Sequence, residues 1–167
     1  MTLTQKIILP ALVSALTFVS QPGAANSSAE TAVNQLRASA GHAPLRYSRK
    51  LEKIAERHAR DMARQGAMTH QSTDGSGPAE RALRAGYTWC RISENIAWGH
   101  NDLTHVIKDW YASPKHRQNM LNGQLQEFGV AKADGNYWVM VIARPGCEKA
   151  ARRSTRTQTA QSGLSSR

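Results

Sequence analysis

Apolar residues recur at helical spacing in one segment of the N-terminal half of the chain. Between Ser48 and Gly66, positions i, i+3, i+4, i+8 and i+11 are apolar (Leu51, Ile54, Ala55, Ala59 and Met62), and His58 falls at i+7. This spacing predicts an amphipathic helix with one buried stripe, capped by Ser48 and ended by Gly66. His58 falls on the stripe, and we interpret it as a hydrogen-bonded core residue rather than a ligand, because burial favours the neutral imidazole.

Shorter patterns predict four more helical segments and three strands. The helical segments run from a capping box at Ser27 to Gly41, from Pro78 to Gly86, from Asp102 to Ala112 and from Ser113 to Leu121. The strands cover residues 91–98, 128–133 and 137–143, and Asp134-Gly135 predicts a hairpin turn between the last two. Ala43-Pro44-Leu45 is interpreted as an extended connection.

The last of these strands is apolar at almost every position, which indicates that both of its faces are covered. Helices come first along the chain, followed by a strand, a helical region and the hairpin, without regular βαβ alternation. The sequence therefore predicts an α+β fold, an α-β-α sandwich with a small antiparallel sheet between helical layers.

The two ends of the chain differ from its middle. Residues 1–25 combine Lys6, an apolar run over 7–19 and the small residues of 23–25, which predicts a secretory signal peptide; an uncleaved anchor is the alternative. The formal charge of the chain is +10, and residues 148–167 carry five Lys or Arg residues against one acid. That segment predicts a basic disordered tail. We expect one domain over 26–147 in a secreted or periplasmic protein.

The chain has two cysteines, Cys90 and Cys147. An even count in an exported protein predicts one disulfide between them, worth about 4 kcal/mol in the chain-entropy model. Neither cysteine stands in a CxxC or zinc-type spacing, so a catalytic thiol is not predicted.

Several short motifs occur in a fixed order between residues 29 and 147. They are Asn34-x-x-Arg37, Pro44-Leu45, Ala59-x-x-Met62-Ala63, Met68-x-His70, Ser93-Glu94-Asn95-Ile96-Ala97, Trp110-x-x-Ser113-x-x-His116-Arg117-x-Asn119-x-Leu121 and Gly129-Val130-Ala131. In this order and spacing the chain resembles the bacterial branch of the CAP/SCP superfamily, which includes cysteine-rich secretory proteins, antigen 5 and plant pathogenesis-related proteins. The resemblance implies an α-β-α sandwich with a cleft lined by two histidines and acidic residues.

By this resemblance the cleft histidines are His70 and His116, and the first acid is Glu94. The chain departs from the pattern at Ser113, where many eukaryotic members carry a second glutamate, so the expected set is His70, Glu94, Ser113 and His116. Two neutral imidazoles can ligate Zn²⁺ or another divalent cation, which makes His70 and His116 the candidate metal ligands. The structural alternative is that Glu94 accepts hydrogen bonds from the histidines and fixes the surrounding loops.

No catalytic residue is predicted. Ser113 precedes Pro114, so its hydroxyl is better explained as the cap of the next helix than as a nucleophile, and the chain contains no G-x-S-x-G. His100 and His105 flank a helix start and are expected to be exposed to solvent. Arg117 either attracts an anionic group or pairs with an acid such as Glu127.

Three aromatic residues, Tyr87, Trp89 and Trp98, either line the cleft for an apolar ligand or pack in the core. The favoured function is a non-enzymatic groove for a small apolar or anionic ligand or a peptide. One alternative is a divalent-metal-dependent hydrolase of peptide or cell-wall material. Another is a surface-associated protein whose basic tail contacts anionic polymers or lipids. We expect a monomer that needs no cofactor and binds no specific nucleic acid.

Overall fold

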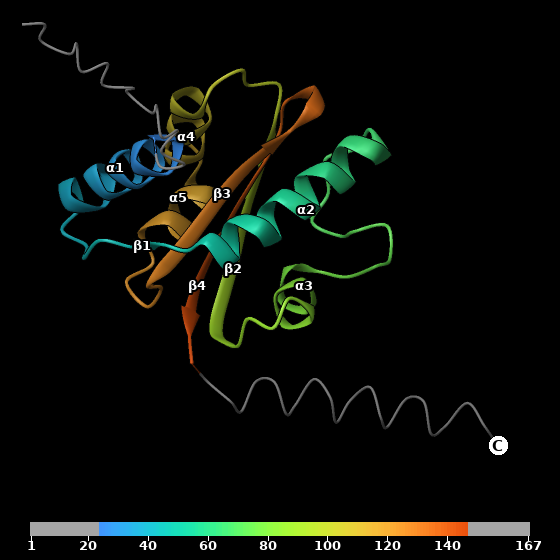
Figure 1. The fold of residues 1–167 in the computed structure, drawn as a ribbon. Helices are drawn as coiled ribbons and strands as arrows, with labels where there is room; N and C mark the ends of the chain where they lie inside the picture. Colours follow the sequence, from blue (N-terminus) through green and yellow to red (C-terminus); the bar gives the residue numbers. More distant parts are fainter. Residues whose placement is uncertain (1–23, 147–167) are drawn as a thin grey trace, which may run out of the picture.

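The structure, a computed structural model, describes residues 24–146 (Figure 1). Its elements are α1 (Ala24–Ser39), β1 (Arg46–Tyr47), α2 (Arg49–Gln65), α3 (Pro78–Arg84), β2 (Trp89–Trp98), α4 (Leu103–Ala112), α5 (Pro114–Leu121), β3 (Glu127–Ala133), the 3-10 turn η1 (Asp134–Asn136) and β4 (Tyr137–Pro145). Helix α1 begins at Ala24, two residues inside the predicted signal peptide. The rest of that segment and the tail 148–167 lie outside the described residues.

The four strands form one sheet in the order β1-β3-β4-β2. As predicted, β2 and β3 pair antiparallel with β4, and the turn between β3 and β4 contains Gly135 at φ 71°. The sheet is nevertheless mixed, because the two-residue β1 pairs parallel with β3. The sequence analysis missed β1 since two residues carry no readable alternation. Strand β2 begins at Trp89, two residues earlier than predicted.

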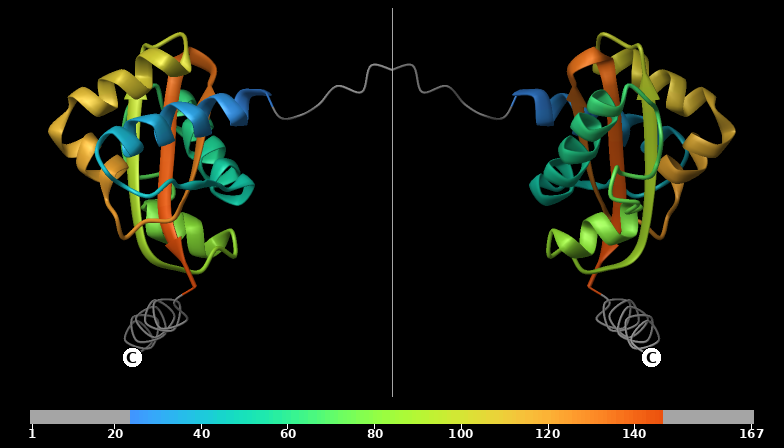
Figure 2. Two further views of the ribbon diagram at one scale, coloured as in Figure 1. Left: turned by 90° about the vertical axis from the view of Figure 1, so that its left-hand side faces the viewer. Right: turned by 90° about the vertical axis from the view of Figure 1, so that its right-hand side faces the viewer.

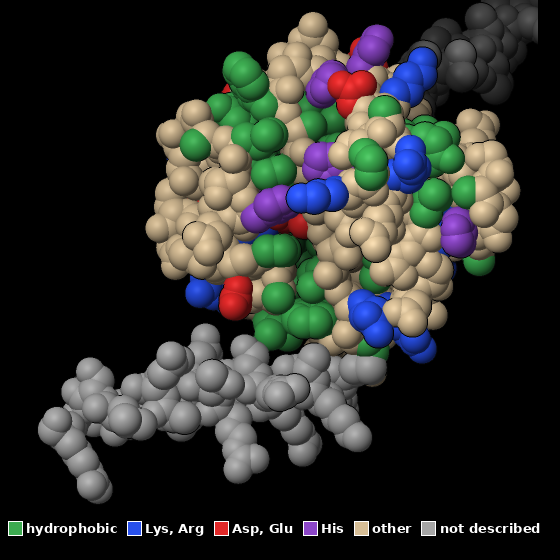
Figure 3. All heavy atoms as spheres, turned by 180° about the vertical axis from the view of Figure 1, so that it is seen from behind, with side chains coloured by type: hydrophobic (Ala, Val, Ile, Leu, Met, Phe, Trp, Pro, Cys, Tyr) green, Lys and Arg blue, Asp and Glu red, His purple; other side chains and the backbone are tan. Residues whose placement is uncertain are grey.

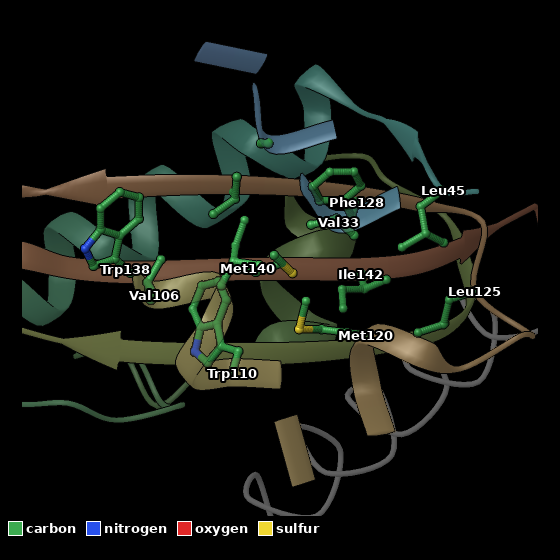
Figure 4. Close-up of a cluster of buried hydrophobic side chains, with 13 residues drawn as sticks. Val33, Leu45, Val106, Trp110, Met120, Leu125, Phe128, Trp138, Met140 and Ile142 are labelled. Atoms are coloured by element: carbon green, nitrogen blue, oxygen red, sulfur yellow. The ribbon is translucent and has the colours of Figure 1, made fainter. Parts of the chain in front are cut away.

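Helices cover both faces of the sheet (Figure 2). Helices α2 and α3 lie on one face, and α1, α4 and α5 lie on the other. Strand β4 supplies Met140 and Ile142 to the core on the α1, α4 and α5 side, shown in Figure 4, and Val139 and Val141 to the core on the other side. The nearly continuous apolar character of β4 is therefore explained, and the predicted α-β-α sandwich is confirmed.

Helix α2 has the caps that the sequence predicts. The Ser48 hydroxyl accepts a hydrogen bond from the Leu51 N–H, and Gly66 ends the helix in the left-handed region at φ 63°. The helix lies directly on β3 at Gly129, where a Cβ atom would stand 2.1 Å from the backbone nitrogen of Glu52. Only glycine permits this approach, which fixes the position of α2 and of the loop that follows it.

Arg37 of α1 is buried and acts as a structural tie. Its guanidinium donates hydrogen bonds to the carbonyl oxygens of Ala43 at 2.7 Å and Met120 at 2.6 Å, which joins α1 to the loop before β1 and to α5. Within residues 24–146, none of the helices combines the length and apolar character that a membrane crossing requires.

Candidate functional site

The candidate site is built on β2, an edge strand of the sheet. Side chains alternate along a strand, so Glu94 points toward the layer of α2 and α3 whereas Asn95 points to the opposite face. Helix α5 is tied to the same point. The Asn119 amide donates to the backbone oxygen of Glu94 at 3.3 Å and to the Asn95 side chain at 2.8 Å, and Asn95 donates to the carbonyl oxygen of His116 at 3.1 Å.

The Glu94 carboxylate is the centre of the cluster. Its side chain is 1% exposed. One oxygen, Oε1, accepts a hydrogen bond from His70 Nδ1 at 2.9 Å, and the other, Oε2, accepts one from Arg81 Nη2 at 2.6 Å. A buried carboxylate requires such partners, because it loses its hydration on burial. The negative charge of Glu94 is therefore balanced by the Arg81 guanidinium.

His58 lies behind this carboxylate, with Nε2 at 3.8 Å from Oε1 of Glu94. The Nε2–H donates to the carbonyl oxygen of Thr69 at 2.8 Å, and Nδ1 accepts from the Ser72 hydroxyl at 3.3 Å. Burial lowers the pKa of His58, so the ring is neutral near pH 7. The structure thus places His58 in the core as a hydrogen-bonded residue, as its position on the helical stripe predicts.

His70 and His116 present their rings at the surface. The His70 side chain is 53% exposed, and because Nδ1–H is held by Glu94, its Nε2 is the ring nitrogen without a partner among the described residues. The His116 ring forms no hydrogen bond within residues 24–146. The pKa of His116 is lowered by partial burial and by the charge of His70. The structure therefore places His70 against Glu94, and Asn95 and Asn119 tie α5, which carries His116, to the same strand.

Figure 3 shows the face of the molecule opposite to the view of Figure 1. Histidine and Lys or Arg side chains gather at its middle around a hollow, with an acidic side chain beneath them. Hydrophobic side chains border the hollow above and below.

Ser113 is at the N-terminal end of α5, three residues before His116. It occupies the N-cap position, but its side chain makes no capping hydrogen bond, which corrects the prediction that its hydroxyl caps the helix. Because φ and ψ of Ser113 are extended at −76° and 121°, the backbone alone makes the break between α4 and α5. No hydrogen bond joins the hydroxyl to His116 in the described part of the chain.

Arg117 does not pair with Glu127. The Arg117 guanidinium donates to the Tyr111 carbonyl oxygen at 3.2 Å and lies 5.9 Å from the centre of the Tyr111 ring. Glu127 instead accepts from Arg46 at 2.6 Å and from the Tyr87 hydroxyl at 2.8 Å. The Arg117 guanidinium is therefore engaged by Tyr111 rather than by an acid.

The other candidates lie away from Glu94. His105 is exposed, as expected, and pairs with Asp102; His100 is largely shielded and pairs with Asp109. Tyr87 is a core residue. Trp89 and Trp98 stand at opposite ends of β2, so the three aromatic residues do not share one wall.

Cys90 is part of β2, with its sulfur 3.6 Å from the carbonyl oxygen of Pro145, the last residue of β4. Cys147 lies outside the described residues. The predicted disulfide between Cys90 and Cys147 thus stays a prediction. Cys90 contacts Pro145, and Cys147 follows Pro145 by two residues in the sequence.

The residues around Glu94 do not fit a metal ion. In the described residues, no group of three or more His, Cys, Asp or Glu side chains is placed to hold one. The carboxylate of Glu94 already contacts a guanidinium, whose positive charge opposes a cation at the same oxygens. The candidate ligands His70 and His116 are left without a third donor.

Arg81 is the residue of this site that the sequence analysis missed. It comes from α3 and also donates to the carbonyl oxygens of His70 at 2.9 Å and Ser76 at 2.7 Å, which holds the loop that carries His70. No signal in the sequence distinguishes it, because arginines are frequent in this chain and its partner Glu94 is 13 residues away.

The model of the cysteine-rich secretory protein family (CAP) matches residues 30–142. An uncharacterized protein of Bacillus subtilis (strain 168), YkwD, is 31% identical over 106 residues, which are 63% of this chain and 41% of the relative. The chain thus spans about two fifths of the length of this curated relative.

Two solved structures share the fold. An extracellular protein of Bacillus anthracis that contains an SCP domain has a TM-score of 0.68 and 24% identity over 71% of this chain and 39% of its own. An outer surface protein of Borrelia burgdorferi has a TM-score of 0.65 and 21% identity over 72% of this chain and 92% of its own.

Proposed function

Because this chain belongs to the cysteine-rich secretory protein (CAP) family, we propose that it is a binding protein and that it works outside the cytoplasm. The surface of His70 and His116 holds the anionic group of a small ligand or peptide, and no bond of the ligand is cleaved. Location outside the cytoplasm is supported by the family and by relatives described as extracellular or outer surface proteins.

One observation carries the proposal: the buried Glu94 carboxylate is bound on one oxygen by Arg81 and on the other by His70. Its charge is compensated inside the protein, so it does not repel an anion at the surface. The hydrogen bond from Nδ1–H also fixes the orientation of the His70 ring, with Nε2 left for a ligand.

The charges around His116 favour an anion over a cation. Lys115 and Arg117 flank His116 in α5, and neither forms an ion pair within residues 24–146. Protonation of either imidazole by a bound acid adds positive charge at the point of contact. A carboxylate or phosphate therefore meets several donors and no uncompensated acid.

The alternative is a hydrolase, and one observation favours it. A histidine whose Nδ1–H is held by a carboxylate is arranged as a general base is. However, the Ser113 hydroxyl is not hydrogen-bonded to His116, and the ligand set does not fit a metal ion. The arrangement therefore supports binding better than turnover.

The test uses the ring signals of the histidines in nuclear magnetic resonance spectra of the wild-type protein. Acetate, decanoate and an acidic tetrapeptide are added in turn at constant ionic strength. We expect saturable shifts of the His70 and His116 signals, and a tighter response to decanoate than to acetate if the ligand has an apolar part. In His70→Ala and in His116→Ala, the affinity read from the remaining histidine signal should fall by about tenfold, as expected for a lost charge-assisted hydrogen bond.

His105→Ala is the matched control, because His105 is exposed and pairs only with Asp102 beside it. Shifts of the His70 and His116 signals that are as large in His105→Ala as in the wild-type protein support binding at His70 and His116. Absence of saturable shifts with all three probes contradicts the proposal. Mass spectrometry of the tetrapeptide, with and without Zn²⁺, detects the alternative: cleavage that requires His70 identifies a hydrolase.

A further inference from the structure

A second cavity lies on the α2 and α3 side of the sheet. It has a volume of about 270 Å³, and its walls come from α2, from α3 and from the loop of residues 72–76. Four of the residues that line it are arginines: Arg57, Arg64, Arg81 and Arg84. This cavity is not part of the surface of His70 and His116, although Arg81 borders both.

The spacing of the chain explains why the arginines converge. Arg57, Asp61 and Arg64 follow at i, i+4 and i+7 on α2, and Arg81 and Arg84 follow at i and i+3 on α3. Each spacing puts side chains on one face of its helix. The two faces meet across the cavity.

The acids of the cavity are already saturated. The Asp61 carboxylate accepts hydrogen bonds from Arg64 at 2.8 Å, from Gln65 at 3.0 Å, and from the backbone N–H and hydroxyl of Thr73 at 2.8 and 3.0 Å. Asp74 accepts from Arg84 and from the backbone and hydroxyl of Ser76. These carboxylates compensate Arg64 and Arg84, and Glu94 compensates Arg81.

Two donors remain. Arg57 forms no hydrogen bond or ion pair with a described residue, so its charge is uncompensated. The Arg81 side chain is only 9% exposed, and its Nε–H is a buried donor without a partner among residues 24–146. An unpaired buried donor is costly in a folded protein, and each such group calls for an explanation.

We propose that this cavity binds a phosphate group, with Arg57 as its charge partner. A tetrahedral oxyanion accepts hydrogen bonds from several directions, which suits guanidinium groups arriving from two helices. The volume is below that of sites for drug-sized molecules, so the bound part is a phosphate with at most a short substituent. This inference is independent of the proposed function of the histidine surface.

The test is calorimetric titration of the full chain with inorganic phosphate and with glycerol phosphate at constant ionic strength. Arg57→Glu is compared with Arg60→Glu, which makes the same change of charge on the same helix. Arg60 pairs with Glu56 and does not line the cavity. We expect Arg57→Glu to weaken phosphate binding by about tenfold or more, and Arg60→Glu by about twofold at most.

Equal weakening in the two variants, or no binding of either soluble phosphate by the wild-type protein, overturns the proposal. Vesicles of phosphatidylcholine with and without phosphatidylglycerol distinguish the source of the phosphate. Vesicle binding that Arg57→Glu weakens and Arg60→Glu does not identifies a lipid headgroup. Binding of the soluble phosphates that depends on Arg57, without vesicle binding that depends on Arg57, identifies a soluble phosphate. Because His70→Ala leaves Arg57 in place, it should not change the phosphate affinity.

Discussion

Two buried carboxylates, Glu94 and Asp61, lie on the same side of the sheet, the side of α2 and α3, and are stabilised in different ways. The side chain of Glu94 is 1% exposed and that of Asp61 is 6% exposed. Glu94 contacts a buried guanidinium and two imidazoles, which are all ionisable. Asp61 is held by the backbone and hydroxyl of Thr73, by Gln65, and by Arg64, whose side chain is 68% exposed.

This difference distinguishes Glu94, which belongs to the candidate site, from Asp61, which has a structural role. Asp61 fastens the loop of residues 72–76 to α2 mainly through neutral donors, and such an arrangement needs no further ligand. Glu94 instead holds an imidazole, that of His70, whose side chain is 53% exposed. Similar burial of two acids therefore says little about function until their partners are compared.

The largest expected effect comes from removing Glu94. In Glu94→Ala the Arg81 charge stays buried without its partner, so the free energy of unfolding should fall by about 3–5 kcal/mol. Urea unfolding followed by circular dichroism measures the loss. Glu94→Gln keeps a hydrogen-bond acceptor and should lose less. A change in Glu94→Ala of under about 1 kcal/mol would show that Arg81 is solvated after all.

Removing Asp61 should have a smaller effect. In Asp61→Ala the Thr73 donors lose their acceptor, which costs about 1–3 kcal/mol, whereas the exposed Arg64 charge returns to water at little cost. The same unfolding experiment applies, and hydrogen exchange of the Thr73 amide reports the loosened loop. If Asp61→Ala lowers the free energy of unfolding as much as Glu94→Ala does, the proposed difference between the two carboxylates is wrong.

The smallest expected effect is the contribution of His58 to the pH dependence of stability. Burial lowers the pKa of His58, so the unfolded chain takes up a proton at a higher pH than the folded protein does. This contribution to stability is present above about pH 6.5 and is lost as the pH falls below that value through the folded pKa. His58→Gln should flatten the decrease over this range, measured as urea midpoints at several pH values.

Asp61 provides the contrast within the same experiment. Burial raises the pKa of Asp61, but hydrogen bonds from Thr73 and Arg64 outweigh it, so the pKa is lowered from 3.8. Its contribution is therefore lost only as the pH falls below about 3.8. Asp61→Asn should flatten that acidic range and change the range that depends on His58 only slightly, because the Asp61 charge is the smallest of the causes that act on the His58 pKa.

The sequence predicted the parts of the fold that repeat a pattern over many residues. Helix α2 shows three turns of apolar periodicity between a serine cap and a glycine, and β4 shows the apolar character of a strand covered on both faces. Strand β1 has two residues, too few for any periodicity, and forms only because β3 lies beside it. The CAP/SCP family that the motifs indicated is confirmed by the family match.

The site was predicted less completely than the fold. The motifs identified His70, Glu94 and His116. The structure joins His70 to Glu94 and ties α5, which carries His116, to β2. Arg81, which compensates the Glu94 charge, belongs to no motif that we recognised, and its role arises from the packing of α3 against β2. Hydrogen bonds between elements that are distant in sequence, such as those from Asn119 to β2, likewise leave no local pattern to read.

The ties between α4, α5 and β2 also bear on how this protein meets copies of itself. Unpaired carbonyl groups on an edge strand invite a strand of another molecule, the first step of many aggregates. Here the Glu94 carbonyl oxygen accepts from Asn119, and that of Ile96 accepts from the Trp110 indole. At the opposite edge the two-residue β1 covers Glu127 and Phe128 of β3, and the Tyr47 hydroxyl donates to the carbonyl oxygen of Val130. The same contacts that position the histidines thus shield the sheet against intermolecular growth.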